Sequence, residues 1–313
     1  MSAVARKRLP SLGRAGLWRP EGALQRSSEG AAILVHRRCG VLCQTARVMS
    51  FQPQPFADCP DAALRAVQGV LTDIDDTLTQ DGALMPSALR ALGALQAAGL
   101  PVVAITGRPV GWSEPFAREW PVRAIVAENG AVALVPRAGG LAVEFVQDEP
   151  ARARNALRLQ AAAARILREM PQARLAQDSP GRVTDIAVDH SECAHLSQAE
   201  IAQVVALMRE EGLNASVSSI HINGWIGEHD KWSGACWAVR RLFGRELAAE
   251  RERWLYVGDS TNDQRMFAQL PSSVGVANLM RFAPQLQAWP RYLARGERGD
   301  GFAEVAQRLL QVR

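Results

Sequence analysis

The chain has 313 residues, of which 48% are hydrophobic, and a formal net charge of +4. It is long enough to bury a substantial core and to form two domains. No apolar run approaches the roughly 18 residues that a membrane-spanning helix needs, so the sequence predicts no such helix. Five cysteines without paired metal-ligand spacing give no disulfide framework, which suits a reducing compartment such as the cytoplasm.

The excess of positive charge lies in residues 1–48, which hold nine basic and two acidic side chains. The rest of the chain has a net charge of −3. The electrostatic case for a nucleic-acid partner rests on this stretch alone, and we expect no such partner. The stretch fits a disordered extension, an arginine-rich transit peptide or an upstream read-through before a true start at Met49. We favour the read-through, and we assign residues 1–60 to a basic, disordered extension.

After this extension, short apolar runs alternate with helical patterns. The sequence predicts strands over 66–71, 101–105 and 123–127, separated by helices that begin at Pro86 and Val110. Strands and helices that alternate in this way predict an α/β fold with a parallel sheet and right-handed crossovers. Ligands of such sheets bind beyond the carboxyl ends of the strands, where Asp73, Thr106 and Asn129 are expected to gather.

The middle of the chain has a different pattern. Helices are predicted over 152–170 and 198–211 and strands over 183–188 and 215–222, which indicates a small inserted α+β domain. A helix over 231–243 and strands over 254–257 and 274–276 then continue the first sheet. We therefore expect a core domain at 61–146 and 227–313, with the inserted domain at 147–226.

A cluster of carboxylates stands where the first predicted strand ends. Asp73, Asp75 and Asp76 occupy three of four consecutive positions, and burying carboxylates is unfavourable unless a cation or hydrogen bonds compensate. Asp73 and Asp75 project to the same side of an extended segment. Asp73 can thus attack a phosphorus centre while Asp75 moves a proton to the leaving group. A hard divalent cation, best matched by Mg²⁺, would screen these charges.

Three further segments complete the predicted site. The hydroxyl of Thr106 and the amide of Gly107 can donate to phosphate oxygens. Lys231 is the only lysine after Lys7 in a chain that otherwise uses arginine, which suggests a compact point charge for phosphate. Asp259 and Asp263, four positions apart after another predicted strand, suit the completion and support of a cation's ligand shell.

These segments together resemble the motifs of the haloacid dehalogenase superfamily of phosphohydrolases. The motifs read here as Asp73-Ile74-Asp75-Asp76-Thr77, Thr106, Lys231 and Gly258-Asp259 through Asp263, and the resemblance covers about residues 66–310. Glu128-Asn129-Gly130, together with the late Asn262-Asp263, is similar to segments of the Cof-type branch, subfamily IIB, which includes sucrose-phosphate and mannosyl-phosphoglycerate phosphatases. This branch implies a Rossmann-like core and an α/β cap inserted between the second and third motifs.

The resemblance also implies roles for individual residues. Asp73 would form an aspartyl-phosphate and Asp75 would act as acid and base. The implied phosphate-binding residues are Thr106, Gly107, Lys231 and Asn262, and the implied Mg²⁺ ligands are Asp73, Asp75 through its carbonyl, Asp259 and Asp263. No catalytic role is assigned to Asp76.

Polar residues of the inserted domain are candidate substrate contacts, because a cap closes over the phosphate site. They are Arg182, Thr184, Asp185, His221 and Asn223. Ordinary positions at the surface or at a strand edge explain Arg182 and His221 equally well. Another polar group there could supply zinc ligands, but we favour a polar loop that enters a helix. This group comprises Asp189, His190, Glu192, Cys193 and His195.

The sequence therefore predicts a Mg²⁺-dependent phosphatase that hydrolyses a small phosphorylated metabolite, with a sugar phosphate as the favoured class. One alternative is a phosphotransferase such as a hexose phosphate mutase, which shares the motifs. The other is a non-catalytic protein that binds sugar phosphates. The predicted partner is a small phosphate ester, with no nucleic acid and no membrane, and no oligomeric state is assigned.

Overall fold

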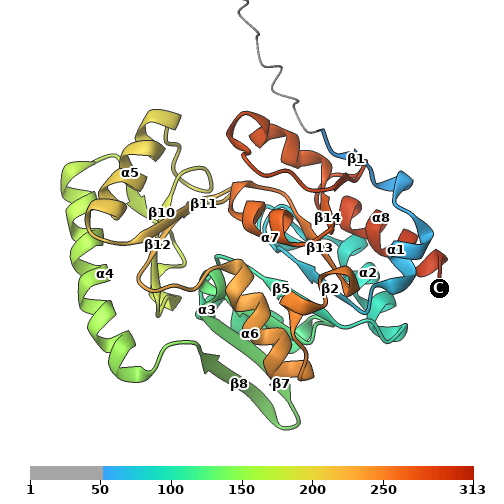
Figure 1. Cartoon of the computed structure of the whole chain (residues 1–313). Helices are drawn as coiled ribbons and strands as arrows, with labels where there is room; N and C mark the ends of the chain where they lie inside the picture. Colours follow the sequence, from blue (N-terminus) through green and yellow to red (C-terminus); the bar gives the residue numbers. More distant parts are fainter. Residues whose placement is uncertain (1–51) are drawn as a thin grey trace, which may run out of the picture. The chain divides into compact units, whose positions relative to one another are not determined.

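Nine strands form the main sheet of the computed structural model, which describes residues 52–313 (Figure 1). The expectations for residues 1–48 concern a stretch outside the described residues. In the spatial order of the sheet, each of the first seven strands is parallel to its neighbours among them, and the last two, β7 and β8, add an antiparallel hairpin. The predicted α/β fold with a parallel-dominated sheet is thus confirmed. The spatial order is β1 (Gln54–Pro55), β15 (Tyr292–Leu293), β14 (Ser272–Gly275), β13 (Trp254–Gly258), β2 (Gly69–Thr72), β5 (Val102–Ile105), β6 (Ala124–Ala127), β7 (Val132–Arg137) and β8 (Gly140–Phe145).

Helices cover both faces of this sheet, because successive strand residues point to opposite sides. In β2, Val70 belongs to one hydrophobic core and Leu71 to the other. The core on the side of Val70 includes α1, α2, α3 and α8, and the core on the side of Leu71 includes α6 and α7. The bounds of these helices are α1 (Asp61–Ala66), α2 (Pro86–Ala97), α3 (Val110–Glu119), α6 (Lys231–Phe243), α7 (Gln264–Gln269) and α8 (Arg298–Gln311).

Residues 147–226, which we call the cap segment, carry a separate antiparallel sheet of four strands. Its order is β11 (Asn214–Val217), β12 (His221–Trp225), β10 (Asp185–Asp189) and β9 (Arg174–Leu175). The helices α4 (Glu149–Glu169) and α5 (Gln198–Glu210) share a hydrophobic core with this sheet, in which Ile166 and Val204 join Val188 and Ile222. That this segment works as a cap domain stays a prediction.

The single strand predicted over 215–222 is wrong, because this stretch forms the hairpin of β11 and β12. The backbone N–H of Ser218 donates to the carbonyl of His221 at 2.9 Å. The Ser218 hydroxyl accepts from the backbone N–H groups of Ile220 at 3.3 Å and His221 at 3.0 Å. A serine that binds nearby backbone in this way favours a turn over a continuous strand.

The boundary of the extension at residue 60 also needs correction. Gln54 and Pro55 form β1, which pairs with β15, and Phe56 is buried in the core on the side of Val70. A buried aromatic side chain contributes strongly to a core, so these residues belong to the folded part of the chain. None of the helices in the described residues has the length and apolar character that a membrane span requires.

Candidate active site

Polar side chains follow three neighbouring strands of the main sheet. Asp73 follows β2, Thr106 follows β5 and Asp259 follows β13. These strands are adjacent and parallel, so their carboxyl ends lie at one edge of the sheet. The backbone N–H of Asp73 still donates to the carbonyl of Val257 at 2.9 Å. The ladder of β2 therefore holds the Asp73 backbone at the point where the strand ends.

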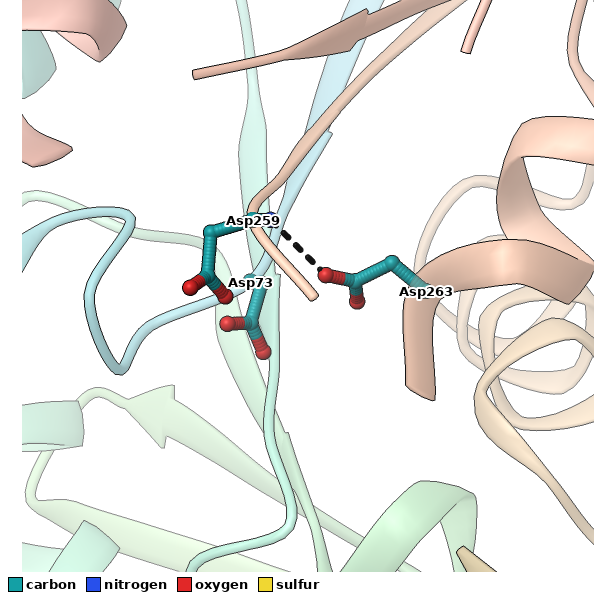
Figure 2. A group of neighbouring side chains, drawn as sticks. All are labelled: Asp73, Asp259 and Asp263. Atoms are coloured by element: carbon teal, nitrogen blue, oxygen red, sulfur yellow. Dashed lines mark hydrogen bonds between the residues drawn. The ribbon is translucent and has the colours of Figure 1, made fainter. Parts of the chain in front are cut away.

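Asp73, Asp259 and Asp263 form a buried acidic cluster (Figure 2). One carboxylate oxygen from each lies within 4.8 Å of the others. Burial raises the pKa of Asp73 to about 8, although the nearby ammonium of Lys231 lowers it. Burial, followed by the charge of Asp73, raises the pKa of Asp259 well above its ordinary value. Further positive charge at this cluster would favour the ionised carboxylates.

The arrangement of Asp259 fits a bound cation. Its Oδ1 is buried and has no hydrogen-bond partner in the described part of the chain, whereas Oδ2 accepts from Asn278 Nδ2 at 3.2 Å. An unpartnered buried carboxylate oxygen is unfavourable unless a cation contacts it. Hard divalent cations prefer oxygen ligands. Asp73 and Asp259 are therefore a suitable donor set for Mg²⁺.

The carboxylate of Asp263 is already bound by four donors. Its Oδ1 accepts from the ammonium of Lys231 at 2.7 Å and from the hydroxyl of Tyr256. Its Oδ2 accepts from the backbone N–H groups of Asp259 at 2.9 Å and Ser260 at 3.1 Å, the first of which is the dashed line in Figure 2. These bonds use the acceptor capacity of the carboxylate. Asp263 thereby holds the loop after β13 and the side chain of Lys231.

Lys231 is the first residue of α6 and is almost completely buried. Its Nζ donates to Asp73 Oδ1 at 2.5 Å, Asp263 Oδ1 at 2.7 Å and Asn262 Oδ1 at 3.1 Å. Burial lowers the pKa of Lys231, but the carboxylates of Asp263 and Asp73 outweigh it and raise the pKa above its ordinary value. The side chain is therefore an ammonium whose three protons all have acceptors.

Two glycines bring the loop after β6 against the helix that carries Lys231. A Cβ on Gly234 of α6 would lie 2.4 Å from Gly130 Cα, and Gly130 has a φ of +105°. Only a residue without a side chain tolerates both the approach and this backbone conformation. Close packing of this loop against α6 therefore requires a glycine at position 130.

Asp75 lies between Thr106 and Arg108. Its Oδ1 accepts from Arg108 Nε at 2.9 Å and its Oδ2 accepts from Thr106 Oγ1 at 3.4 Å. The guanidinium of Arg108 is buried and also donates to Asp178 at 3.2 Å and Glu192 at 2.7 Å in the cap segment. One arginine thus connects Asp75 with two carboxylates of the cap segment.

Strained backbone conformations concentrate around the site. Asp76, Asp81 and Arg298 line a cavity of about 380 Å³ together with Asp75, Arg108 and Glu192. Asn129 lines a second cavity together with Lys231, and Glu128 binds the cap segment. Non-glycine residues with positive φ are uncommon and tend to mark functional sites. In the described residues they are Asp76, Asp81, Glu128, Asn129 and Arg298.

Comparisons with known proteins agree with this arrangement. Residues 70–143 match the family model of haloacid dehalogenase-like hydrolases. A Thermoplasma acidophilum protein of known structure shares 16% identity over 79% of this chain and 99% of its own, with a TM-score of 0.60. The protein has the haloacid dehalogenase fold. The resemblance stated from the sequence is thereby confirmed at the level of the superfamily.

Two structures of sugar phosphatases with the haloacid dehalogenase fold are also similar. The sucrose-phosphatase of Synechocystis, solved with sucrose and phosphate, shares 17% identity over 78% of this chain and 98% of its own, with a TM-score of 0.56. A subclass IIB sugar phosphatase shares 14% identity over 79% of this chain and 100% of its own, with a TM-score of 0.55. No curated protein sequence matches the chain.

The structure brings the predicted haloacid dehalogenase motifs together. Lys231 donates to Asp73, Asp263 and Asn262 at the acidic cluster, and Thr106, which Gly107 follows directly, donates to Asp75. Asp76 lies one step away and accepts from Arg298 Nε at 2.8 Å. Its backbone carbonyl accepts from Asn278 Nδ2 at 2.9 Å, and the same nitrogen donates to Asp259. Asp76 therefore braces the loop after β2.

The predicted substrate contacts of the cap segment are buried, and none of them lines the cavity beside Asp75. Arg182, Asp185 and Asn223 bind one another, and both Arg182 and Asn223 donate to the carbonyl of Gly107. Thr184 donates to Glu128, and His221 lies 3.0 Å from Glu192. Arg182, Asn223 and Thr184 thus connect the cap segment with the core, whereas Asp185 and His221 contact residues of the cap segment itself. The cap segment instead contributes Ser191, Glu192, Ser219 and Ile220 to this cavity.

The loop considered for zinc is organised by hydrogen bonds. The carboxylate of Asp189 accepts from the backbone N–H groups of Ser191, Glu192, Cys193 and Ala194. The single group of potential metal ligands found in residues 52–313 is the one at Asp73. The interpretation as a polar loop before α5 is thus the better one, and the loop presents Glu192 to the cavity.

Sequence reasoning missed Arg108 and Glu128 as functional positions. Arg108 gave no compositional signal, since arginine is common throughout this chain. Glu128 is completely buried and accepts from backbone N–H groups of Val110, Val183 and Thr184. Its place directly after an apolar strand was a usable signal, like that of Asp73.

Proposed function

We propose that this protein is a Mg²⁺-dependent phosphatase that hydrolyses a small phosphorylated metabolite, with sugar phosphates as the favoured substrates. The observation that supports this proposal best is the buried pair of Asp73 and Asp259 beside Lys231, with one carboxylate oxygen unpartnered. The similar structures of a sucrose-phosphatase and a sugar phosphatase point to the same substrate class.

In the proposed reaction, an oxygen of Asp73 attacks phosphorus and the ester P–O bond breaks. Asp75 gives its proton to the departing alkoxide. Water then attacks the phosphorus of the aspartyl-phosphate and gives a proton to Asp75, which releases inorganic phosphate and restores Asp73. The position of Asp75 next to the cavity of about 380 Å³ supports this assignment, because the leaving group needs space beside its proton donor.

Four groups are proposed to bind the transferred phosphate. They are the Thr106 hydroxyl, which contacts Asp75, the amide of the adjacent Gly107, the Lys231 ammonium, which contacts Asp73, and the side-chain amide of Asn262, whose oxygen accepts from Lys231. Donors that are fixed before the reaction stabilise developing negative charge effectively. The ammonium of Lys231 already contacts the carboxylate that attacks phosphorus, so it is in place to bind an oxygen of the transferred phosphate.

Asp73, Asp259 and the backbone carbonyl of Asp75 would hold Mg²⁺. When bound, this ion would screen the carboxylates from the phosphate and stabilise negative charge in the transition state. Asp263 was predicted as a further ligand, but its four hydrogen bonds favour a positioning role toward Lys231.

A panel of sugar phosphates and other phosphate esters tests the proposal. We expect phosphate release with Mg²⁺, none with EDTA, and none from purified Asp73→Asn protein. Release by Asp73→Asn at the wild-type rate contradicts the nucleophile assignment. A hexose phosphate mutase would instead isomerise a substrate with little release, and a binding protein would retain the ester unchanged.

A further inference from the structure

The cap segment binds the loop that carries the predicted phosphate ligands through one backbone carbonyl. The carbonyl of Gly107 accepts from Arg182 Nη1 at 3.0 Å and from Asn223 Nδ2 at 3.2 Å. Asp185 anchors both donors, at 2.9 Å from Arg182 Nη1 and 3.0 Å from Asn223 Nδ2. The side chains of these three cap residues are buried. We call this group, Arg182, Asp185 and Asn223, the carbonyl clamp.

The fit between the clamp and Gly107 is tight. A Cβ at residue 107 would lie 3.1 Å from Asn223 Oδ1 and 3.3 Å from Asn129 Oδ1. A side chain at residue 107 would therefore require Asn223 or Asn129 to shift by a few tenths of an ångström. A buried arginine and a buried amide that donate to one carbonyl and share one carboxylate are costly to assemble, which indicates a specific purpose for the orientation of this peptide.

The clamp fixes the peptide unit between Gly107 and Arg108. In a trans peptide the C=O and N–H bonds point in opposite directions. The carbonyl points to the clamp, and the N–H of Arg108 donates to Thr106 Oγ1 at 2.9 Å. The hydroxyl oxygen of Thr106 is therefore an acceptor of this bond, and its proton is directed elsewhere. In this structure Oγ1 lies 3.4 Å from Asp75 Oδ2.

We propose that Arg182 and Asn223 are positioning residues that, through the peptide between Gly107 and Arg108, aim the Thr106 hydroxyl proton at the transferred phosphate. This inference rests on the proposed phosphatase function. The side chains of the clamp are buried and none of them lines the cavity beside Asp75, so they do not contact a substrate bound in that cavity. It acts by holding one donor in the orientation that the transition state requires.

Asn223→Ala tests the clamp, and Asn214→Ala is its matched control. Asn214 lies on the neighbouring strand β11 and donates to the carbonyl of Gly227, away from Gly107. We expect kcat of the Asn223→Ala protein to fall about tenfold while KM changes less than about twofold, since a transition-state donor is misplaced. The Asn214→Ala protein should keep both constants.

A double-mutant cycle separates positioning from general damage. In a Thr106→Val protein the hydroxyl is already gone, so adding Asn223→Ala should change kcat by less than about twofold. Independent, multiplicative losses in the double variant overturn the proposal, as does an unchanged kcat in Asn223→Ala. Asn223→Ser, which is smaller but polar, takes the place of Asn223→Ala if that protein does not fold.

Amide hydrogen exchange gives a readout that needs no activity. The Arg108 amide should exchange about tenfold faster in Asn223→Ala than in wild type or Asn214→Ala, because the clamped peptide becomes free to rotate. Unchanged exchange at Arg108 overturns the clamp even in an active enzyme. If wild type hydrolyses no ester, the phosphatase proposal fails while this measurement still decides whether the clamp exists.

Discussion

The ammonium of Lys231 lies 2.5 Å from a carboxylate oxygen of Asp73, with both side chains buried where β2 ends. The two residues stand 158 positions apart in the chain. Lys231 also donates to Asp263, so one cation faces two buried carboxylates. The charge balance of the site thus depends on this lysine and on any cation that joins it.

Replacement of Lys231 by methionine should reduce both activity and stability. The change keeps the shape of the side chain but leaves the carboxylates of Asp73 and Asp263 without their cation. We expect the free energy of unfolding in urea, measured with EDTA at a pH above the Asp73 pKa of about 8, to fall by about 3 to 5 kcal/mol. Adding Asp73→Asn should recover part of this loss, because one buried charge is removed. Arg118→Met on the exposed side of α3, where the arginine pairs only with Glu114, is the control and should change stability little.

The acidic cluster predicts opposite pH trends for the metal-free and the Mg²⁺-bound protein. The pKa of Asp73 is raised from 3.8 to about 8, so the folded metal-free protein binds more protons than the unfolded chain between these values. Its stability should therefore decline as pH rises through this window. Mg²⁺ binding requires ionised carboxylates, so stabilisation by Mg²⁺ should grow over the same window.

Thermal unfolding with Mg²⁺ and with EDTA, at several pH values across this window, measures both trends. The Asp259→Asn protein is the control and should show little response to Mg²⁺ at any pH. An increase in Tm with Mg²⁺ that is independent of pH in wild type would argue against the cluster as the metal site.

Glu128 should be a major determinant of stability between the core and the cap segment. Alanine at this position would leave the buried N–H groups of Val110, Val183 and Thr184 without an acceptor. We expect the free energy of unfolding to fall by about 3 kcal/mol or more. Thr184→Val removes only the hydroxyl bond to Glu128 and should cost about 1 kcal/mol. Equal losses in the two variants, measured by urea unfolding, would contradict this role.

Glu192 should contribute to recognition of the leaving group. It lines the cavity beside Asp75, and the bonds from His221 and Arg108 keep its carboxylate ionised, with its pKa lowered to about 2. Glu192→Gln should raise KM for a hydroxyl-rich sugar phosphate by about tenfold, as expected for one hydrogen bond to a charged group. The KM of p-nitrophenyl phosphate, which lacks hydroxyl groups, should change much less. A parallel increase for both substrates would place the leaving group elsewhere.

The sequence alone predicted the residues that we propose for the chemistry and the order of the elements that carry them. Asp73 and Asp259 were recognisable because a carboxylate directly after a buried, largely apolar strand demands compensation. Lys231 was recognisable because lysine is so rare in this chain. These are local properties of spacing and composition, and they do not require knowledge of which segments meet.

Only the tertiary structure decided how the cap segment meets the core. Arg182 and Asn223 were expected to contact substrate, but they bind the carbonyl of Gly107, while Glu192 faces the cavity instead. The turn at Ser218 splits one predicted strand in two and allows β11 and β12 to pair with Ser216 opposite Asn223. Such partners are chosen by packing between segments far apart in the chain. The spacing of residues in the sequence indicates which side chains share one face of a helix or strand. Only the folded structure shows which other segment that face contacts.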